Sequence, residues 1–264
     1  MNYLNYLWKN IKPDNGFFCY NINGGYMLIM SFNVKRIILF KFGRYRRVVD
    51  YIKIKRPDII GFQELNDKSL KIYTKNLDNY SIVGQGSSKN ILFREYTSIF
   101  IDKKYEIISS KTYSLTSKVD NIGYKEKEDN LPRICVVCHI KDKKNKILVV
   151  NTHIDNTDSN NKYKQLLILE KIINDEIEKD EKLILMGDFN MSLNNKRMPL
   201  FIDRNKLLDP FNDYLGGSFP SRPDMRMIDH IFLRGFKFID RCVDINSNDN
   251  GYMSDHNPIM CNIK

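Results

Sequence analysis

The sequence has few of the residues that build a protein held together by disulfides or zinc. It contains five cysteines, an odd number, and the pair Cys135 and Cys138 has no second closely spaced pair to accompany it. A disulfide framework uses an even set of cysteines, and a structural zinc site uses about four ligands. The pair falls within the apolar run Ile134–Ile140, where residues three apart on a strand point to opposite faces. We therefore expect buried free thiols.

The sequence also lacks a long apolar run. Every such run is far shorter than the roughly 20 residues needed to span a bilayer, so we expect no stable membrane insertion. Near the start, Lys9, Lys12 and Asp14 interrupt the apolar residues, and no small-residue cleavage site follows. This pattern argues against a secretory signal peptide. We expect a cytoplasmic protein.

Internal repeats, low-complexity stretches and linkers rich in Pro, Gly or Ser are absent from the middle of the chain. A length of 264 residues fits one large domain or two small ones, and 42% hydrophobic residues suffice for a sizeable core. We expect one domain over residues 26–264 in a monomeric chain. Residues 1–25 form an N-terminal extension in this interpretation, with a short helix at Tyr3–Asn10 and a turn at Asn23–Gly25.

Positive charge is what the sequence has in excess. Lysine and arginine (42) outnumber aspartate and glutamate (32), which gives a formal net charge of +10 and a pI near 9.2. A basic protein attracts polyanions such as nucleic acid or an anionic membrane surface. The excess is spread along the chain without a long basic tail, so solubility alone is an alternative explanation. Together with the acidic clusters described below, it predicts a polyanionic substrate, most simply nucleic acid.

Apolar patterning predicts many short strands with three or four helices between them. The helices are expected at Gly43–Lys55, Asp67–Asn76 and Ser159–Glu178, with a short one within residues 194–208. The polar stretch 110–130 predicts a surface loop or hairpin. Because strands and helices do not alternate strictly, the order favours α+β layers over a doubly wound parallel sheet. The expected strands are Tyr26–Val34, Ile59–Phe62, Tyr80–Val83, Thr97–Ile101, Tyr105–Ile108, Arg133–Ile140, Lys146–Thr152, Lys182–Met186, Met227–Leu233, Phe236–Cys242 and Ile259–Ile263.

Acidic and polar clusters stand where the apolar runs stop. Short apolar runs are typical of buried strands, so these clusters should be delivered by strand ends to one place. Carboxylate oxygens suit Mg²⁺ or Mn²⁺, and a histidine paired with an aspartate suits acid–base chemistry near neutral pH. We interpret the pattern as that of a metal-dependent hydrolase that cleaves phosphate esters. The clusters are Gln63–Glu64, Asn151–Asp155, Gly187–Asn190 and Ser254–Pro258.

Six segments in a fixed order carry a more specific signal, namely Ser31–Val34, Gln63–Glu64, Thr152–Asp155, Gly187–Asn190, Ile228–Ile231 and Ser254–Pro258. Each alone occurs often by chance, but together they resemble the endonuclease/exonuclease/phosphatase superfamily. The resemblance extends from about Met27 to Cys261. It implies a DNase I-like fold, in which helices flank two packed, mostly antiparallel β-sheets in a four-layer sandwich. It also implies a phosphoester hydrolase that depends on Mg²⁺ or Mn²⁺.

The resemblance implies a metal site built from Glu64, Asp255 and Asn33. In this interpretation Glu64 is the principal metal ligand, Asp255 is a second metal contact, and Asn33 anchors the glutamate or a phosphate. A carboxylate at a strand end can hold Mg²⁺ while waters complete the octahedron. The alternatives are a surface glutamate that begins the next helix, and an asparagine that ends a strand at a turn.

The resemblance also implies the acid–base residues. Asp188 orients or deprotonates the attacking water, Asn190 holds a phosphate oxygen, and His256 is the catalytic histidine that Asp229 orients. Asp188 and Asn190 lie two residues apart, so both can face one side of the strand end. An Asx turn is the alternative for this pair. Whether His256 or Asp188 takes the proton from water stays open.

A second histidine, His153, resembles the one that contacts the scissile phosphate in DNase-like members, and Glu95 stands in the place of its supporting glutamate. Arg133 is a candidate for phosphate binding, with an ordinary surface salt bridge as the alternative. Asp155 belongs to the pattern without an assigned role. His139 and His230 are expected to pack rather than to react.

Departures from the family's subgroups leave the substrate open. Lys35 stands where abasic-site endonucleases and tyrosyl-DNA phosphodiesterase 2 carry aspartate, and Met186 stands where inositol phosphatases carry tryptophan. The whole pattern, with Phe219–Ser221, looks most like a broad bacterial-type branch of hydrolases.

Three functions are therefore weighed. The first is hydrolysis of phosphodiester bonds in nucleic acid, with Tyr124 and Phe219 available for base stacking. The second is a phosphatase or phosphodiesterase for a small molecule or lipid headgroup, of sphingomyelinase or inositol-phosphatase type. No apolar hairpin for membrane contact is obvious in the sequence. The third is a non-catalytic binding module, which would have lost Glu64 or His256, and both are present.

Overall fold

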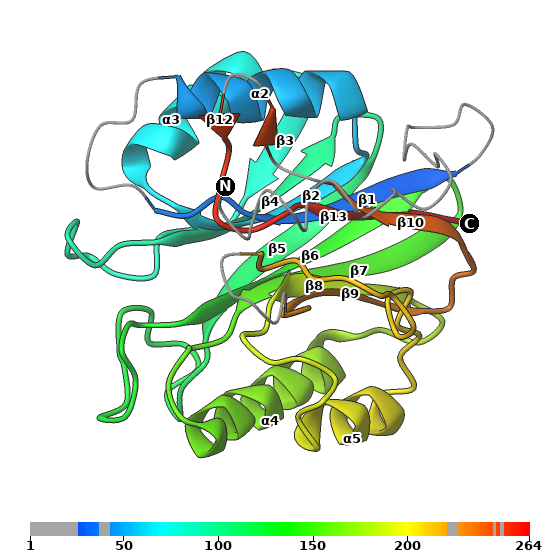
Figure 1. The fold of residues 1–264 in the computed structure, drawn as a ribbon. Helices are drawn as coiled ribbons and strands as arrows, with labels where there is room; N and C mark the ends of the chain where they lie inside the picture. Colours follow the sequence, from blue (N-terminus) through cyan, green and yellow to red (C-terminus); the bar gives the residue numbers. More distant parts are fainter. Residues whose placement is uncertain (1–25, 37–42, 221–225, 245–246, 249–250) are drawn as a thin grey trace.

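The computed structural model describes residues 26–36, 43–220, 226–244, 247–248 and 251–264. These residues form four layers, in which two β-sheets pack face to face between two pairs of helices (Figure 1). Helices α2 (Arg44–Lys55) and α3 (Asp67–Asn76) cover one sheet, and α4 (Ser159–Glu176) and α5 (Arg197–Arg204) cover the other. The expectations for residues 1–25 lie outside the described residues.

The first sheet has six strands in the order β10-β13-β1-β2-β4-β3. Only β1 and β2 pair in parallel, and the other pairs are antiparallel. The strands are β1 (Met27–Asn33), β2 (Ile59–Leu65), β3 (Tyr80–Val83), β4 (Tyr96–Asp102), β10 (Phe238–Val243) and β13 (Ile259–Ile263).

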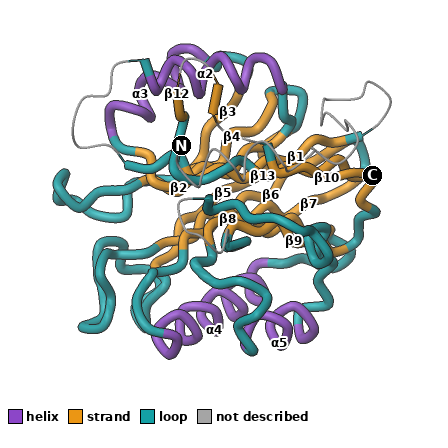
Figure 2. Tube along the Cα trace, viewed as in Figure 1, coloured by secondary structure: helices purple, strands orange, loops and turns teal. Residues whose placement is uncertain are grey.

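The second sheet has five strands in sequence order, and only β7 and β8 pair in parallel. Figure 2 shows the strands gathered in the two middle layers with the helices outside them. The expected α+β architecture of two packed, mostly antiparallel sheets flanked by helices is confirmed. The strands are β5 (Glu106–Ser114), β6 (Ile134–Asp142), β7 (Asn145–His153), β8 (Lys182–Asp188) and β9 (Asp229–Arg234), with a separate short pair of β11 (Ser247–Asn248) and β12 (Gly251–Tyr252).

Three apolar clusters account for the layering. One lies between the sheets and draws on both, another lies under α4 and α5, and a third lies under α2 and α3. Cys138 belongs to the cluster between the sheets and Cys135 to the one under α4, so the two thiols point to opposite faces of β6. Both are buried and free, as the sequence predicts.

One expectation about the strands is wrong. The predicted strand at Tyr105–Ile108 is part of β5, which continues to Ser114 and pairs with β6 through residues assigned to a surface loop. Strand β5 is an edge strand whose side chains are mostly exposed from Glu106 to Lys111. Its polar composition reflects that exposure, so apolar patterning could not detect its full length.

The two parallel pairs bring functional side chains to one end of the sandwich. Because β1 and β2 run in the same direction, Asn33 lies beside Gln63, and for the same reason His153 on β7 lies beside Asp188 on β8. Gly187 makes the second approach possible, because a Cβ there would lie 2.1 Å from the Thr152 carbonyl oxygen. The strand ends therefore meet at one edge.

The buried side-chain amide of Asn151 joins the two sheets by hydrogen bonds next to that edge. Asn151 of β7 donates from Nδ2 to the carbonyl oxygens of Phe62 and Ser98 in the first sheet, both at 2.9 Å. Its Oδ1 accepts from Gln63 Nε2 at 2.7 Å. Gly61 is required opposite it, since a Cβ there would lie 2.8 Å from Asn151 Oδ1. This contact fixes the end of β2, where Glu64 follows, against the ends of β7 and β8.

Candidate functional site

The register of the second sheet places three candidate residues in a row. His153 pairs with Asp188, and Asp188 pairs with Asp229, across the ends of β7, β8 and β9. All three side chains are buried. Residues from distant parts of the sequence therefore share one end of the sheet, as the sequence predicts.

A loop before β13 brings His256 to this row. Ser254 Oγ donates to the Asn33 carbonyl oxygen at 2.6 Å and accepts the His256 backbone N–H at 3.2 Å, which fixes the loop against β1. His256 Nδ1 then lies 2.8 Å from Asp229 Oδ2. Burial alone would lower the pKa of His256, but the Asp229 carboxylate outweighs it and raises that pKa to about 10. The ring is an imidazolium at neutral pH.

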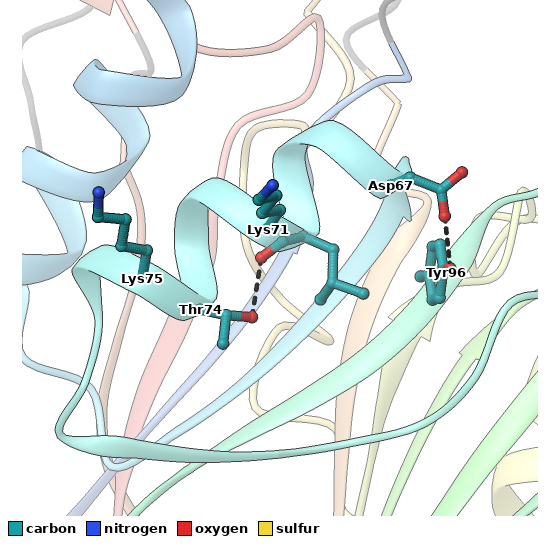
Figure 3. A pocket seen from close by; sticks show the side chains of 6 residues that line it. Asp67, Lys71, Thr74, Lys75 and Tyr96 are labelled. Atoms are coloured by element: carbon teal, nitrogen blue, oxygen red, sulfur yellow. Dashed lines mark hydrogen bonds between the residues drawn. The ribbon is translucent and has the colours of Figure 1, made fainter.

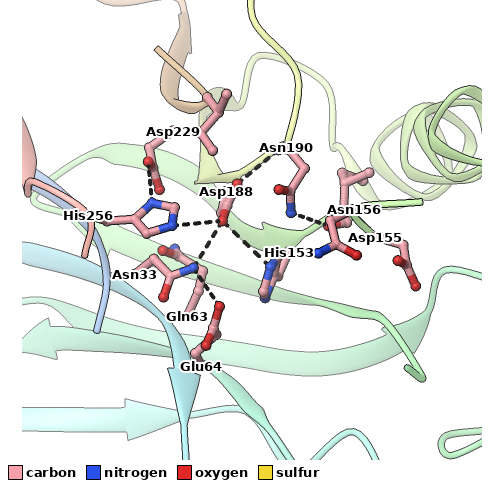
Figure 4. A network of polar contacts seen from close by, with 12 residues as sticks. Asn33, Gln63, Glu64, His153, Asp155, Asn156, Asp188, Asn190, Asp229 and His256 are labelled. Carbon is pink, nitrogen blue, oxygen red and sulfur yellow. Dashed lines mark hydrogen bonds and ion pairs between the residues drawn. The ribbon is translucent and has the colours of Figure 1, made fainter. Parts of the chain in front are cut away.

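Asp188 is the centre of the site (Figure 4). Its Oδ2 lies 3.6 Å from His153 Nε2 and 3.8 Å from His256 Nε2, and it accepts the Asn33 amide at 2.9 Å. Burial, together with the neighbouring Asp229 carboxylate, raises the pKa of Asp188. A carboxylate whose proton affinity is raised in this way is suited to hold a proton taken from water.

Glu64 reaches the same place from the first sheet. A register shift between Phe62 and Leu65 and a left-handed backbone at Glu64, with φ 59°, turn its side chain out of the strand pattern. Its carboxylate accepts the Asn33 amide at 3.1 Å and the Arg36 backbone N–H at 2.9 Å. The structure thus contradicts the alternative of a surface glutamate that merely begins the next helix.

Asn33 bridges two carboxylates. Its Nδ2 donates to both Glu64 and Asp188, while its Oδ1 accepts the Lys35 backbone N–H at 2.9 Å. The anchoring of Glu64 agrees with the expectation. Its amide hydrogens face the carboxylates and its oxygen keeps a second lone pair, so its place among the metal ligands stays a prediction.

Asp255 lies next to a built-in cation. The Lys35 ammonium group forms an ion pair with Asp255 Oδ2, and Asp255 stands outside the cluster around Asp188. A metal ion bound by Asp255 would share this carboxylate with the ammonium group. The second metal contact therefore stays a prediction.

Glu95 lies beside His153, as expected, but Arg133 joins the two side chains. Glu95 Oε2 lies 3.9 Å from His153 Nδ1, while Arg133 Nη1 lies between them, 2.9 Å from Glu95 Oε2 and 3.0 Å from His153 Nδ1. The alternative of a surface salt bridge for Arg133 is wrong, as its side chain is 6% exposed. Its Nη1 contacts Glu95 and His153, and its assignment to substrate binding stays a prediction.

Asn190 and Asp155 hold backbone in place. The Asn190 backbone N–H donates to Asp188 Oδ1 at 2.8 Å, which is the Asx turn considered as an alternative. Its side-chain amide donates to the Ile154 carbonyl oxygen at 2.9 Å, so its contact with a phosphate stays a prediction. Asp155 has no assigned role in the sequence analysis. In the structure it is fully buried and accepts backbone N–H groups of Asn130 and Thr157, so it anchors the neighbouring loop.

The donor set fits a hard divalent cation. Ligand atoms of Asp188, Asp229 and His256 all lie within 4.8 Å of one another, and Asp229 Oδ1 is buried without a hydrogen-bond partner among the described residues. Two of these groups already share the His256–Asp229 hydrogen bond, however. Glu64 is joined to Asp188 through the Asn33 amide, and its role as the primary ligand stays a prediction.

Sequence reasoning missed two supporting residues, Arg36 and Ser218, and assigned no role to Ser254 within its cluster. Arg36 donates its backbone N–H to Glu64 and lies with Nε 3.6 Å from Glu95, so it connects two acids of the site. Ser218 Oγ accepts the backbone N–H groups of Ile228 and Asp229. Ser254 holds the His256 loop, as described above. Their contacts are to backbone or across long sequence distances, which no motif encodes.

Among the other aromatic and histidine candidates, Phe219 borders the site, whereas Tyr124, His139 and His230 make other contacts. The ring centroid of Phe219 lies 4.7 Å from that of His256, which agrees with the expectation that it borders the site. Tyr124 bonds Glu126 in its own loop, and no described contact joins it to the site. His139 bonds Glu181 and Glu176, and His230 stacks on Phe232, so both pack as expected.

A separate depression of about 460 Å³ lies on the surface of α3 (Figure 3). None of its lining residues belongs to the network around Asp188. It is lined by Asp67, Leu70, Lys71, Thr74, Lys75 and Tyr96.

Known proteins resemble this chain in sequence and in fold. A protein of Acanthamoeba polyphaga mimivirus is 30% identical over 154 residues, which cover 54% of this chain and 56% of the viral protein. The chain thus spans about half the length of the curated relative that it matches.

Two solved structures are similar over most of their length. A mannosyl-6-phosphatase of Bacteroides thetaiotaomicron superposes with a TM-score of 0.80 at 24% identity, covering 90% of this chain and 99% of that one. TDP2 of D. rerio, crystallised with a single-strand DNA product, superposes with a TM-score of 0.73 at 18% identity, covering 91% and 100%. At these identities the likeness shows a shared fold.

Among the described helices, none is long and apolar enough to cross a membrane.

The family assignment rests on the sequence as well as on the fold. The endonuclease/exonuclease/phosphatase family matches residues 19–256, a range that contains the first five segments and the sixth as far as His256. The structure brings the side chains of these segments around Asp188. The chain belongs to the endonuclease/exonuclease/phosphatase family, whose members are phosphoester hydrolases.

Proposed function

We propose that the protein is a divalent-metal-dependent phosphodiesterase that hydrolyses phosphodiester bonds in nucleic acid. The observation that carries the proposal is the position of Asp188, whose carboxylate faces His153 on one side and His256 on the other, with Glu64 joined to it through Asn33. A phosphodiester needs an activated water, neutralised oxygens and a stabilised leaving oxygen. This cluster contains one group for each requirement.

The residues of the chain divide these tasks. Asp188, with its raised pKa, orients the attacking water and accepts its proton. His256, held as an imidazolium by Asp229, stabilises the negative charge that develops on the phosphoryl oxygens. Glu64 would hold the divalent cation, which when bound neutralises phosphate oxygens and polarises water. His153 faces the same carboxylate from the opposite side.

Three observations support a nucleic-acid substrate. The chain carries a formal net charge of +10, which attracts polyanions. The fold is shared with TDP2 of D. rerio, whose crystal structure holds a single-strand DNA product. The Phe219 ring, next to His256, offers a flat surface on which a base can stack.

A second candidate is a phosphate ester of a small molecule or lipid headgroup. The fold is shared with a mannosyl-6-phosphatase, and an apolar loop tip stands beside the site. Ile91, Leu92 and Phe93 are 69%, 74% and 50% exposed, and Arg36 donates from Nη1 to the Leu92 carbonyl oxygen. Exposed consecutive apolar residues of this kind often contact lipid or protein. Sequence patterning did not detect this tip because the apolar run is only three residues long.

Turnover of a substrate panel tests the proposal. Plasmid, single-stranded DNA, RNA, sphingomyelin, inositol phosphates and bis-p-nitrophenyl phosphate are incubated with Mg²⁺, Mn²⁺ or EDTA. We expect metal-dependent hydrolysis of nucleic acid that falls steeply between about 50 and 200 mM salt, because ionic contacts to phosphates weaken. Hydrolysis of sphingomyelin or inositol phosphates alone would favour the second candidate.

The variant Leu92→Ser with Phe93→Ser separates the two candidates further. If the tip contacts lipid, the double variant loses turnover of vesicle-borne substrate and keeps turnover of bis-p-nitrophenyl phosphate. If the substrate is nucleic acid, vesicle binding is absent in the unmodified protein as well. The matched control is Leu215→Ser, because Leu215 is 99% exposed and lies in a different loop.

A further inference from the structure

Arg133 occupies an unusual place for a cation, directly behind a histidine of the site. It precedes β6 and its side chain is 6% exposed. Its Nη1 lies 2.9 Å from Glu95 Oε2 and 3.0 Å from His153 Nδ1. Its Nε lies 3.8 Å from Asp155 Oδ2. Two buried carboxylates therefore hold the guanidinium in place against the ring.

The chemistry of the guanidinium decides the proton position on His153. Arginine carries only N–H donors and stays charged in proteins, so the nitrogen that faces it must accept. His153 Nδ1 therefore carries no hydrogen, and the proton of the neutral ring lies on Nε2. Nε2 is the atom that faces Asp188 Oδ2 at 3.6 Å. A charged ring would place an N–H against the N–H of Arg133.

We propose that Arg133 is a positioning residue that holds His153 as its neutral Nε2–H tautomer, so that His153 donates a hydrogen bond into the site and does not exchange a proton there. One consequence of the inference rests on the proposed function, namely that Nε2–H is directed at a phosphate oxygen of the substrate. The tautomer itself rests on the contacts of Arg133 alone.

Glu95 acts on His153 only through this arginine. The carboxylate lies 3.9 Å from Nδ1, beyond hydrogen-bond distance, and Arg36 Nε lies 3.6 Å from the same carboxylate. Without Arg133, Glu95 would be the nearest charged neighbour of Nδ1 and would favour the imidazolium. The charge nearest to His153 Nδ1 is therefore positive with Arg133 in place and would be negative without it.

The remaining charges around the ring agree with this assignment. Complete burial lowers the pKa of His153, and the Arg133 and His256 cations lower it further. Asp188 is the anion on the other side, and its raised proton affinity limits the opposing effect.

The test is the protonation pattern of the imidazole nitrogens, measured by two-bond ¹H–¹⁵N correlation on protein labelled with ¹⁵N-histidine. The chain has four histidines, so single His→Gln variants assign every signal. We expect His153 to show Nε2 protonated and Nδ1 bare from about pH 6 to pH 8. In Arg133→Met we expect His153 to bind a second proton at the acidic end of that range, while Arg133→Lys retains the neutral pattern because a lysine also donates to Nδ1.

Arg36→Met is the matched control, because it removes another cation that faces Glu95 without touching His153. It should leave the His153 tautomer unchanged. A proton on Nδ1 in the unmodified protein, or an unchanged His153 pattern in Arg133→Met, would overturn the inference. Should Arg133→Met not fold, the unmodified protein and Arg133→Lys decide the question.

The kinetic consequence is measured separately. With the best substrate of the panel, Arg133→Met should show a kcat that falls at acidic pH, where His153 can now bind a second proton, while KM changes less. If no substrate is turned over, the proposed function fails and the tautomer measurement still stands. If turnover is found but His153 is protonated on Nδ1, the inference fails and the proposed function stands.

Discussion

The two sides of Asp188 carry the same side chain in opposite electrical surroundings. His256 is backed by the Asp229 carboxylate at 2.8 Å, and its pKa is raised to about 10. His153 is backed by the Arg133 guanidinium at 3.0 Å, and its pKa is lowered well below the ordinary value. Both rings are buried and both face the same oxygen through Nε2.

The difference shows that the partner behind a histidine decides what the histidine can do. An anion fixes the tautomer and favours the charged form, whereas a cation fixes the tautomer and excludes the charged form. Around Asp188 the site therefore holds one imidazolium and one neutral ring. Of the two rings, only His256 carries a positive charge in this arrangement.

The largest expected effect on kcat comes from replacing Asp188, the carboxylate that both histidines face. Asp188→Asn keeps the size of the side chain but cannot accept a proton from water, so kcat should fall by about 10³- to 10⁴-fold. Steady-state hydrolysis of bis-p-nitrophenyl phosphate measures it. Asp120→Asn, which alters an exposed ion pair with Lys111, serves as the control and should stay within about threefold. A near-normal rate in Asp188→Asn would mean that Asp188 is structural.

A second variant removes the Asp229 carboxylate behind the His256 ring. In Asp229→Asn, burial still lowers the pKa of His256 while its main opposing charge is gone. The unmodified enzyme should keep its imidazolium until pH approaches about 10, whereas the variant loses it at a much lower pH. We therefore expect kcat to fall by about 10²-fold at pH 9 and by less at pH 6. An equal loss at both values would show that Asp229 acts by position alone.

A third variant concerns the metal ion rather than the histidines. Glu64→Gln keeps the hydrogen-bonding geometry with Asn33 but weakens the hard anionic ligand, so the Mg²⁺ concentration for half-maximal activity should rise by about 10- to 100-fold. Metal titration of activity measures it. Asp255→Asn should shift that concentration less, because the Lys35 ammonium group already neutralises Asp255. Equal shifts would place the ion between the two acids instead.

The smallest effect on activity is expected at a third histidine, outside the site. His139 lies between Glu181 at 2.9 Å and Glu176 at 3.2 Å, and these hydrogen bonds outweigh burial and raise its pKa. The resulting stability is fully present below the unfolded pKa and is lost as pH rises through the raised folded pKa. His139→Gln should lower the free energy of unfolding by about 1–3 kcal/mol at pH 6 and by less at pH 9, with activity near normal.

Guanidinium unfolding at pH 6 and pH 9 measures this difference. A larger stability loss at pH 9 than at pH 6 would contradict the assigned charge of His139. A large loss of activity at unchanged stability would instead connect this histidine to the site.

Most of the fold and most of the site could be predicted from the sequence, because both depend on local residue patterns. Apolar runs bounded the strands, and the acidic clusters after those runs identified Glu64, Asp188 and His256, which the structure brings together. Edge strand β5 was underestimated since its exposed side chains are polar. Its pairing with β6 is a tertiary property that apolar periodicity does not encode.

The charge pattern within the site could not be predicted, because it depends on a contact between residues 20 positions apart. Arg133 lies between Glu95 and His153 only because β6 and β7 pair as a hairpin and β4 packs across from them. In sequence, glutamate and histidine suggest a direct pair. The backbone bonds of Arg36, Ser218 and Ser254 escaped detection for the same reason.

The most direct test of the account is the turnover of His256→Gln, compared with the unmodified protein at saturating Mg²⁺ and near-neutral pH. We expect kcat for phosphodiester hydrolysis to fall by about 10³-fold while the far-UV circular dichroism spectrum is unchanged. A folded His256→Gln protein that retains one-tenth or more of the original kcat would contradict it, because the imidazolium beside Asp188 would then be dispensable.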